Sequence, residues 1–127
     1  MMYNAPVNQI TDTLNDIARI DDLAATGGFP NFDGDLIAPI LDEANKLARD
    51  VLSPLNPIGH KHGVKLTDAG VVSAPGFSDA YARFREGGWM GLAFPEEFGG
   101  QGLPKTMALA VMEMMHAANM AFALCPL

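Results

Sequence analysis

The sequence is poor in the residues that mark several large classes of protein. Cysteine occurs once, at Cys125, so the chain can form no internal disulfide. Lysine and arginine together number 8 against 15 aspartates and glutamates, which gives a formal net charge of −7. A nucleic-acid binder needs a basic surface that replaces the counterions of the phosphates, and an anionic membrane attracts basic segments. The charge balance therefore argues against both partners.

Targeting and membrane-spanning patterns are missing as well. The first residues, MMYNAPVNQI, show no basic patch followed by an apolar run, which is the pattern of a secretory signal peptide. The most apolar run, MALAVMEMM at 107–115, is interrupted by Glu113 and is much shorter than the roughly 20 residues that span a bilayer. We therefore predict no membrane span and a cytoplasmic protein, a location that the single cysteine fits.

Apolar residues make up 49% of the 127 positions, which is enough to build the core of one domain. Near the start, apolar residues recur at helical spacing and predict an amphipathic helix over residues 6–23; they are Val7, Ile10, Leu14, Ile17 and Ile20. The segment TGGFPNF at 26–32 is rich in helix breakers and predicts a hinge. We therefore divide the chain into an N-terminal extension, residues 1–32, and a body, residues 33–127.

The first helix of the body is the clearest one in the sequence. An apolar stripe runs through residues 36–55, and Asp33 or Asp35 can cap its first turn. We expect the helix to end near SPLNP because Pro54 and Pro57 lack the backbone N–H that a helix interior needs. Next, residues 64–73 predict a small hairpin or an irregular loop around Gly70.

Two more helices are predicted in the second half of the chain. Residues 75–88 place four apolar side chains on one face, namely Phe77, Ala80, Tyr81 and Phe84. Another helix runs from about Pro104 to Ala117, Asn119 interrupts it, and a new helix begins at Met120. The fold class is therefore mostly α with one small hairpin or loop. The last residues, NMAFALCPL, form an apolar run without a cap, so we expect a truncated domain from a longer protein.

The stretch LAFPEEFGGQGLP at 92–104 raises the question of a phosphate-binding loop. GQGLPK matches the first half of a dinucleotide fingerprint, but Lys105 stands where the third glycine belongs and no strand pattern precedes it. The carboxylates of Glu96 and Glu97 would also repel a pyrophosphate. We predict instead a tight turn between helices, in which the glycines supply positive φ and close approach.

No set of side chains in the sequence makes a complete catalytic or metal site. Glu113 and His116 have the Glu-x-x-His spacing of di-iron bundles, but such sites need two of these pairs. We expect a hydrogen-bonded or half-exposed His116, and surface positions for His60 and His62 in a polar loop. Cys125 has no neighbouring histidine or lysine that would lower its pKa, so we expect a buried, inert thiol.

Three segments in order resemble the N-terminal helical domain of the FAD-dependent acyl-CoA dehydrogenases: EANKLARDVLSPLN, GGWMGLAFPEEFGGQGLP and MEMMHAANMAFALCPL. The residues that match the family pattern are Trp89, Gly91, Leu92, Pro95, Glu97, Gly99, Gly100, Gly102, Leu103 and Glu113. The similarity covers residues 33–127, as an incomplete domain of this type. The leading MYNAPVNQITDTL resembles the short extension of a bacterial branch that includes the methylmercaptopropionyl-CoA dehydrogenases.

This resemblance implies α,β-dehydrogenation of an acyl-CoA thioester. In the family a glutamate removes the α proton, FAD accepts the hydride, and an electron-transfer flavoprotein takes the electrons. The catalytic glutamate and most FAD contacts lie in two further domains, so we expect no catalytic, cofactor-binding or metal residue here. We also expect no FAD on the isolated chain, which would be inactive alone, and an oligomer for the full-length protein.

The resemblance implies a second role, in which this domain forms one wall of the acyl pocket. By position the wall residues are Met120, Phe122, Cys125, Pro126 and Leu127. Apolar side chains suit an alkyl or thioether chain, which offers no strong hydrogen bonds. The alternative is that several of them only fill the core. A different hypothesis is a stand-alone helical interaction module that uses its methionine-rich face, and a metal-binding helical bundle ranks last.

Overall fold

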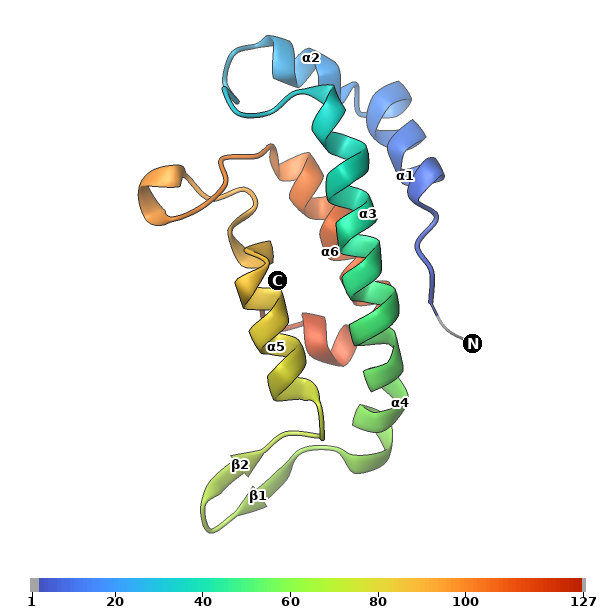
Figure 1. Cartoon of the computed structure of the whole chain (residues 1–127), viewed down its shortest axis with the longest axis vertical. Helices are drawn as coiled ribbons and strands as arrows, with labels where there is room; N and C mark the ends of the chain where they lie inside the picture. The colour runs from blue at the N-terminus through green and yellow to red at the C-terminus, as the bar shows by residue number, and fades with distance from the viewer. Residues whose placement is uncertain (1–2, 127) are drawn as a thin grey trace.

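Helices dominate the structure, a computed structural model that describes residues 3–126 (Figure 1). The elements are α1 (Val7–Asp12), α2 (Ile20–Ala25), α3 (Ile37–Leu47), α4 (Ser53–His62), β1 (Lys65–Thr67), β2 (Gly70–Val72), α5 (Phe77–Glu86) and α6 (Lys105–Ala123). The predicted mostly α class with one small hairpin is confirmed. Across the described residues, every helix is too short or too polar to cross a membrane.

The N-terminal helix differs from the single helix predicted over residues 6–23. α1 passes into a π-helical turn, Thr13–Ile17, and Arg19 then adopts a left-handed conformation with φ of 50° before α2 begins. A π turn holds more residues than an α turn, so the apolar stripe shifts around the helix. As a result Ile17 is 78% exposed, although Ile10, Leu14 and Ile20 are buried as predicted.

The N-terminal extension is tied to the body by hydrogen bonds and by apolar packing. The Tyr3 N–H donates to Ser53 Oγ at 3.0 Å, and the Ala5 N–H donates to Asn45 Oδ1 at 2.9 Å. α1 packs against α3, and its buried residues belong to the main core. The division at residues 1–32 and 33–127 stays a prediction.

The predicted end of the first body helix near Pro54 and Pro57 is wrong. α3 continues through a π-helical segment, Ala48–Leu52, into α4, which ends only at Gly63. Pro54 falls in the first turn of α4, and Pro57 lies on the exposed side of that helix. Pro54 directly follows the π-helical turn, and such a turn is one way for a continuous helix to accommodate the N–H that a proline lacks. The predicted cap is confirmed at Asp33, whose Oδ1 accepts the Asp35 N–H at 3.0 Å.

The core lies where α6 crosses behind the long α3–α4 helix (Figure 1). α6 contacts α3, the π-helical segment and α4, and it buries several large side chains completely, among them Met107, Val111, Met114 and Met115. α5 lies on the left side of Figure 1, and the hairpin projects below it with Leu66 opposite Val71 in an antiparallel pair. Three of the five methionines in residues 107–120 therefore lie in the core.

The glycine-rich stretch is a self-contained turn between the 3-10 turn Trp89–Gly91 and α6. Its amides donate to carbonyls of the same loop: Gln101 N–H to Gly91 O at 2.9 Å, Gly102 N–H to Phe94 O at 2.9 Å and Leu103 N–H to Leu92 O at 2.8 Å. A phosphate cradle needs backbone amides that point free toward the ligand. Because these amides already have partners, the loop serves to reverse the chain, as predicted.

Replacing Gly100 with alanine should destabilise this turn strongly. A Cβ at position 100 would lie 2.0 Å from the Phe94 carbonyl oxygen, which is backbone and cannot move aside. We expect the free energy of unfolding, measured by urea denaturation, to fall by about 3 kcal/mol. Gly99→Ala is the matched control, since position 99 has φ of 80° but no atom near its Cβ, and it should cost only about 1 kcal/mol. Equal losses in the two variants would contradict this account of the turn.

Candidate functional site

The site begins at a kink in α6, where the backbone of Asn119 leaves the helical region with φ of −160° and ψ of 89°. The predicted interruption at Asn119 is therefore confirmed. Its side chain is 1% exposed and makes two hydrogen bonds: Nδ2 donates to the Leu52 carbonyl at 3.1 Å, and Oδ1 accepts the Phe122 N–H at 3.1 Å. Asn119 thus caps the last turn of α6 and fixes it to the long helix.

That cap presents Phe122 to an aromatic cluster on α5. The Phe122 ring is 6% exposed and meets the Phe84 ring edge-on, with centroids 5.8 Å apart. The Phe77 centroid lies 6.2 Å from that of Phe122, and Tyr81 stacks on Phe84 at 6.5 Å. Such ring pairs add to the free energy of burial, so α5 and the last turn of α6 hold each other in place.

A cavity of about 500 Å³ opens beside this cluster, and we call it the kink cavity. Its lining residues are Ser73, Phe77, Ser78, Tyr81, Met90, Phe122, Cys125 and Pro126. Aromatic rings and sulfur atoms form most of the wall. The Tyr81 hydroxyl lies 3.9 Å from Met90 Sδ, a weak hydrogen bond that joins α5 to the turn before the glycine loop. The cavity is therefore mostly apolar, and Ser73, Ser78 and Tyr81 add hydroxyl groups to its wall.

A second cavity of about 360 Å³, here the turn cavity, adjoins the first and shares Met90 and Pro126 with it. Its other lining residues are Trp89, Leu92, Ala93, Phe94, Lys105, Ala108, Leu109 and Met112. Lys105 is the one charged residue in this lining. The two cavities together make an apolar hollow on either side of Pro126, of a size that suits an aliphatic ligand.

The sequence-predicted wall residues fall into three groups. Phe122, Cys125 and Pro126 line the kink cavity, and Pro126 also lines the turn cavity. Met120 is 58% exposed and lies outside both linings. Leu127 lies outside the described residues. The structure thus brings three of the five residues to one hollow.

Sequence reasoning missed several residues of the hollow. Tyr81 was predicted on the buried face of its helix but is 43% exposed, because only the Ala80 and Phe84 side of α5 faces the core. Ser78 lies three residues before Tyr81, so helical spacing could have placed both on one stripe. Met90 and Ser73 come from separate turns, and no spacing rule connects them with α5.

Cys125 is exposed, so the prediction of a buried thiol is wrong. The residue follows the end of α6 in a turn. Its position at the cavity edge leaves the sulfur open to solvent.

This exposure predicts that Cys125 reacts in the folded chain. We expect a thiol reagent such as DTNB to label one equivalent per chain without denaturant, at a rate within about tenfold of a small free thiol. Absorbance of the released thiolate measures the reaction. Labelling that requires urea would show that Cys125 is covered after all.

The histidines and the glycine loop are the other candidate sites within residues 3–126. His116 Nδ1 lies 2.8 Å from the Met112 carbonyl, which confirms a hydrogen-bonded histidine. The described residues contain no group of three or more His, Cys, Asp and Glu that could hold a metal ion. His60 and His62 are exposed as predicted, although they lie in α4 and not in a loop. The glycine loop does not fit FAD phosphates, because its amides are paired internally.

Comparison with known proteins adds two findings. The family described as "Acyl-CoA dehydrogenase, N-terminal domain" matches residues 40–127. A protein of Ruegeria pomeroyi, 3-methylmercaptopropionyl-CoA dehydrogenase, is 33% identical over 127 residues. The match covers 100% of this chain and 22% of that relative, so the chain spans about a fifth of the relative's length.

Proposed function

The chain belongs to the acyl-CoA dehydrogenase family, and we propose that it forms one wall of the pocket that holds the acyl group of an acyl-CoA thioester. The observation that carries this proposal is the hollow around Pro126, into which Phe122 and Cys125 also face. In this role the chain contributes shape and apolar surface, and it contributes no group to the chemical step. Met120 and Leu127 remain part of the proposed wall.

Apolar contact is what an acyl wall needs, because an alkyl chain gains affinity mainly by leaving water. Phe122 supplies a ring that is held by its cap and by two neighbouring rings, so little side-chain freedom is lost when a ligand binds. The exposed Met90 and Cys125 add sulfur atoms, which are polarisable and adapt to irregular ligands. The hollow is thus partly preformed and partly adaptable.

We further propose a short acyl chain that carries a thioether as the substrate class. The relative from Ruegeria pomeroyi is named for a 3-methylmercaptopropionyl group, which ends in a methyl sulfide. Sulfur makes favourable contacts with aromatic ring edges, and the kink cavity offers Phe77, Tyr81 and Phe122. A thioether also accepts weak hydrogen bonds, which a tyrosine hydroxyl can donate.

The other parts of the reaction come from outside this chain in our proposal. Bound FAD would accept the hydride. The base that removes the α proton lies in a further domain, and so does the surface that contacts an electron-transfer flavoprotein. A cytoplasmic location and an oligomeric full-length enzyme belong to the same proposal. The isolated 127-residue chain is inactive on this view, since its residues serve to shape a pocket.

The wall can be tested directly by NMR, because a chain of 13.5 kDa gives well-resolved spectra. Titration with 3-methylmercaptopropionyl-CoA should shift the methyl resonance of Met90 and the amides of Phe122 and Cys125, whereas Leu66 on the hairpin should not move. Phe122→Leu should reduce these shifts. Shifts confined to residues away from the kink and turn cavities would overturn the proposed wall.

Inactivity of the isolated chain needs a separate measurement. Purified chain should show no flavin absorbance after incubation with FAD and gel filtration, and no dye-linked oxidation of an acyl-CoA. Stoichiometric flavin together with substrate oxidation would contradict the view that other domains supply the chemistry.

A further inference from the structure

Met90 has a central place in the hollow. It lines both the kink cavity and the turn cavity, and the residue is 42% exposed. Its sulfur accepts the hydrogen bond from the Tyr81 hydroxyl at 3.9 Å. A thioether that belongs to the protein itself is thus already seated at the one phenol hydroxyl in the wall of the kink cavity.

The Met90 side chain is chemically the same group as the end of the proposed substrate. Beyond its Cα, a methionine carries two methylene groups, a sulfur atom and a methyl group. A 3-methylmercaptopropionyl group carries the same atoms in the same order beyond its carbonyl carbon. A place that fits the first group in shape and in hydrogen bonding therefore also fits the second.

The two partners of this hydrogen bond differ in mobility. Tyr81 is fixed, because its ring stacks on the ring of Phe84 with centroids 6.5 Å apart, and Phe84 is fully buried. Met90 lies in the 3-10 turn Trp89–Gly91, and its side chain has three rotatable bonds. When it turns away it loses only a long, weak hydrogen bond. The hydroxyl therefore stays in place while the thioether can be exchanged.

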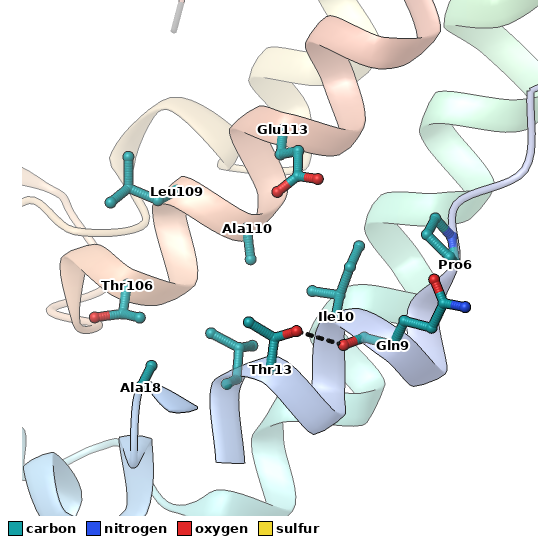
Figure 2. Close-up of a pocket in the computed structure, with 10 residues that line it drawn as sticks. Pro6, Gln9, Ile10, Thr13, Ala18, Thr106, Leu109, Ala110 and Glu113 are labelled. Carbon is teal, nitrogen blue, oxygen red and sulfur yellow. Dashed lines mark hydrogen bonds between the residues drawn. The ribbon is translucent and has the colours of Figure 1, made fainter. Parts of the chain in front are cut away.

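The groove between the N-terminal helix and α6 offers a thioether no such place (Figure 2). Its walls present the Gln9 amide, the Thr13 hydroxyl and the Glu113 carboxylate, and none of the 10 side chains drawn contains a sulfur atom or an aromatic ring. Sulfur makes its favourable contacts with aromatic rings. The kink cavity, with its rings and its Tyr81 hydroxyl, is the better match for a thioether.

We propose that Tyr81 is a specificity-determining residue and that Met90 holds the place of the substrate thioether until the acyl chain displaces it. This inference rests on the proposed function, because it requires that an acyl chain enters the hollow. A thioether that displaces Met90 replaces the hydrogen bond that it breaks. An alkyl chain of the same length breaks the bond without replacing it, so it binds less tightly.

The test uses two thioesters, 3-methylmercaptopropionyl-CoA and pentanoyl-CoA, in which a methylene group replaces the sulfur. NMR titration of the 127-residue chain should give a dissociation constant about threefold lower for the thioether. Tyr81→Phe keeps the ring and removes the hydroxyl, so it should bind both thioesters equally. The gain should fall on pentanoyl-CoA, because its entry then breaks no hydrogen bond.

Tyr3→Phe is the matched control, since it removes the hydroxyl of the other tyrosine in the chain, which lies outside the linings of both cavities. It should keep the threefold preference. Met90→Leu keeps a side chain of similar volume but has no acceptor for the Tyr81 hydroxyl. Both thioesters should bind this variant about threefold more tightly, with the ratio between them unchanged.

The outcomes separate this inference from the acyl wall. Equal binding of the two thioesters by the native chain, with the shifts of Phe122 and Cys125 still present, would overturn the role of Tyr81 and leave the wall standing. A preference that survives Tyr81→Phe would do the same, and unchanged affinities in Met90→Leu would overturn the role of Met90. Binding of neither thioester would overturn the wall and this inference together.

Discussion

Replacing Asn119 with alanine will lower the free energy of unfolding by about 3 kcal/mol and will release the last turn of α6. The substitution removes the cap on the Phe122 N–H, worth about 1 kcal/mol, and leaves that amide and the Leu52 carbonyl without these partners in a buried place, which costs about 2 kcal/mol more. Urea denaturation monitored by circular dichroism measures the loss.

Two further variants separate the roles of the Asn119 side chain. Asn119→Ser keeps an oxygen that can cap Phe122 but loses the donor to Leu52, so it should cost about half as much. Asn119→Asp keeps the cap and places a carboxylate against the Leu52 carbonyl, so it should be at least as harmful as alanine. A loss below about 1 kcal/mol for Asn119→Ala would contradict the bridging role.

Replacing Phe84 with alanine will have the largest effect of the core substitutions beneath the site. Phe84 is fully buried and contacts the rings of both Phe122 and Tyr81. Removal of its ring should lower the free energy of unfolding by about 4 kcal/mol, since it opens a cavity and breaks two aromatic pairs. Thermal or urea unfolding checks this value.

The Phe84 variant also tests whether the core shapes the site. Without the ring, Phe122 can turn inward, so the shifts of Phe122 and Cys125 in the acyl titration should shrink even in conditions where the chain is folded. Phe84→Leu fills part of the space and should cost roughly 1.5 kcal/mol with most of the ligand response kept. An unchanged titration in Phe84→Ala would show that the site does not depend on this support.

Local pattern was enough to predict much of the fold. The long apolar stripe of α3, the hairpin at Gly70, the glycine turn and the break at Asn119 each depend on residues within a few positions of one another. The same turn and the Glu113 helix carried the family resemblance, which the comparisons bear out. Backbone propensity and helical spacing act over short distances, so sequence reports them well.

Other features depended on context that no local rule contains. The two prolines predict a helix end, yet the chain continues as a helix through both of them, with a π-helical turn directly before Pro54. Arg19 takes a left-handed conformation that its residue type does not favour, and the π-helical turn before it leaves Ile17 in solvent. Packing against the rest of the chain outweighed propensity at these positions.

The sequence by itself determined that this chain is a mostly helical, acidic domain of the acyl-CoA dehydrogenase type. It also determined that the glycine-rich stretch at 92–104 forms a tight turn before the last helix. Only the tertiary structure decided which residues surround the hollow. Asn119 and Leu52 are 67 residues apart along the chain, and α1 and α6 come from opposite ends of it. Contacts of that separation are set by how whole helices pack, and spacing within one segment carries no information about them.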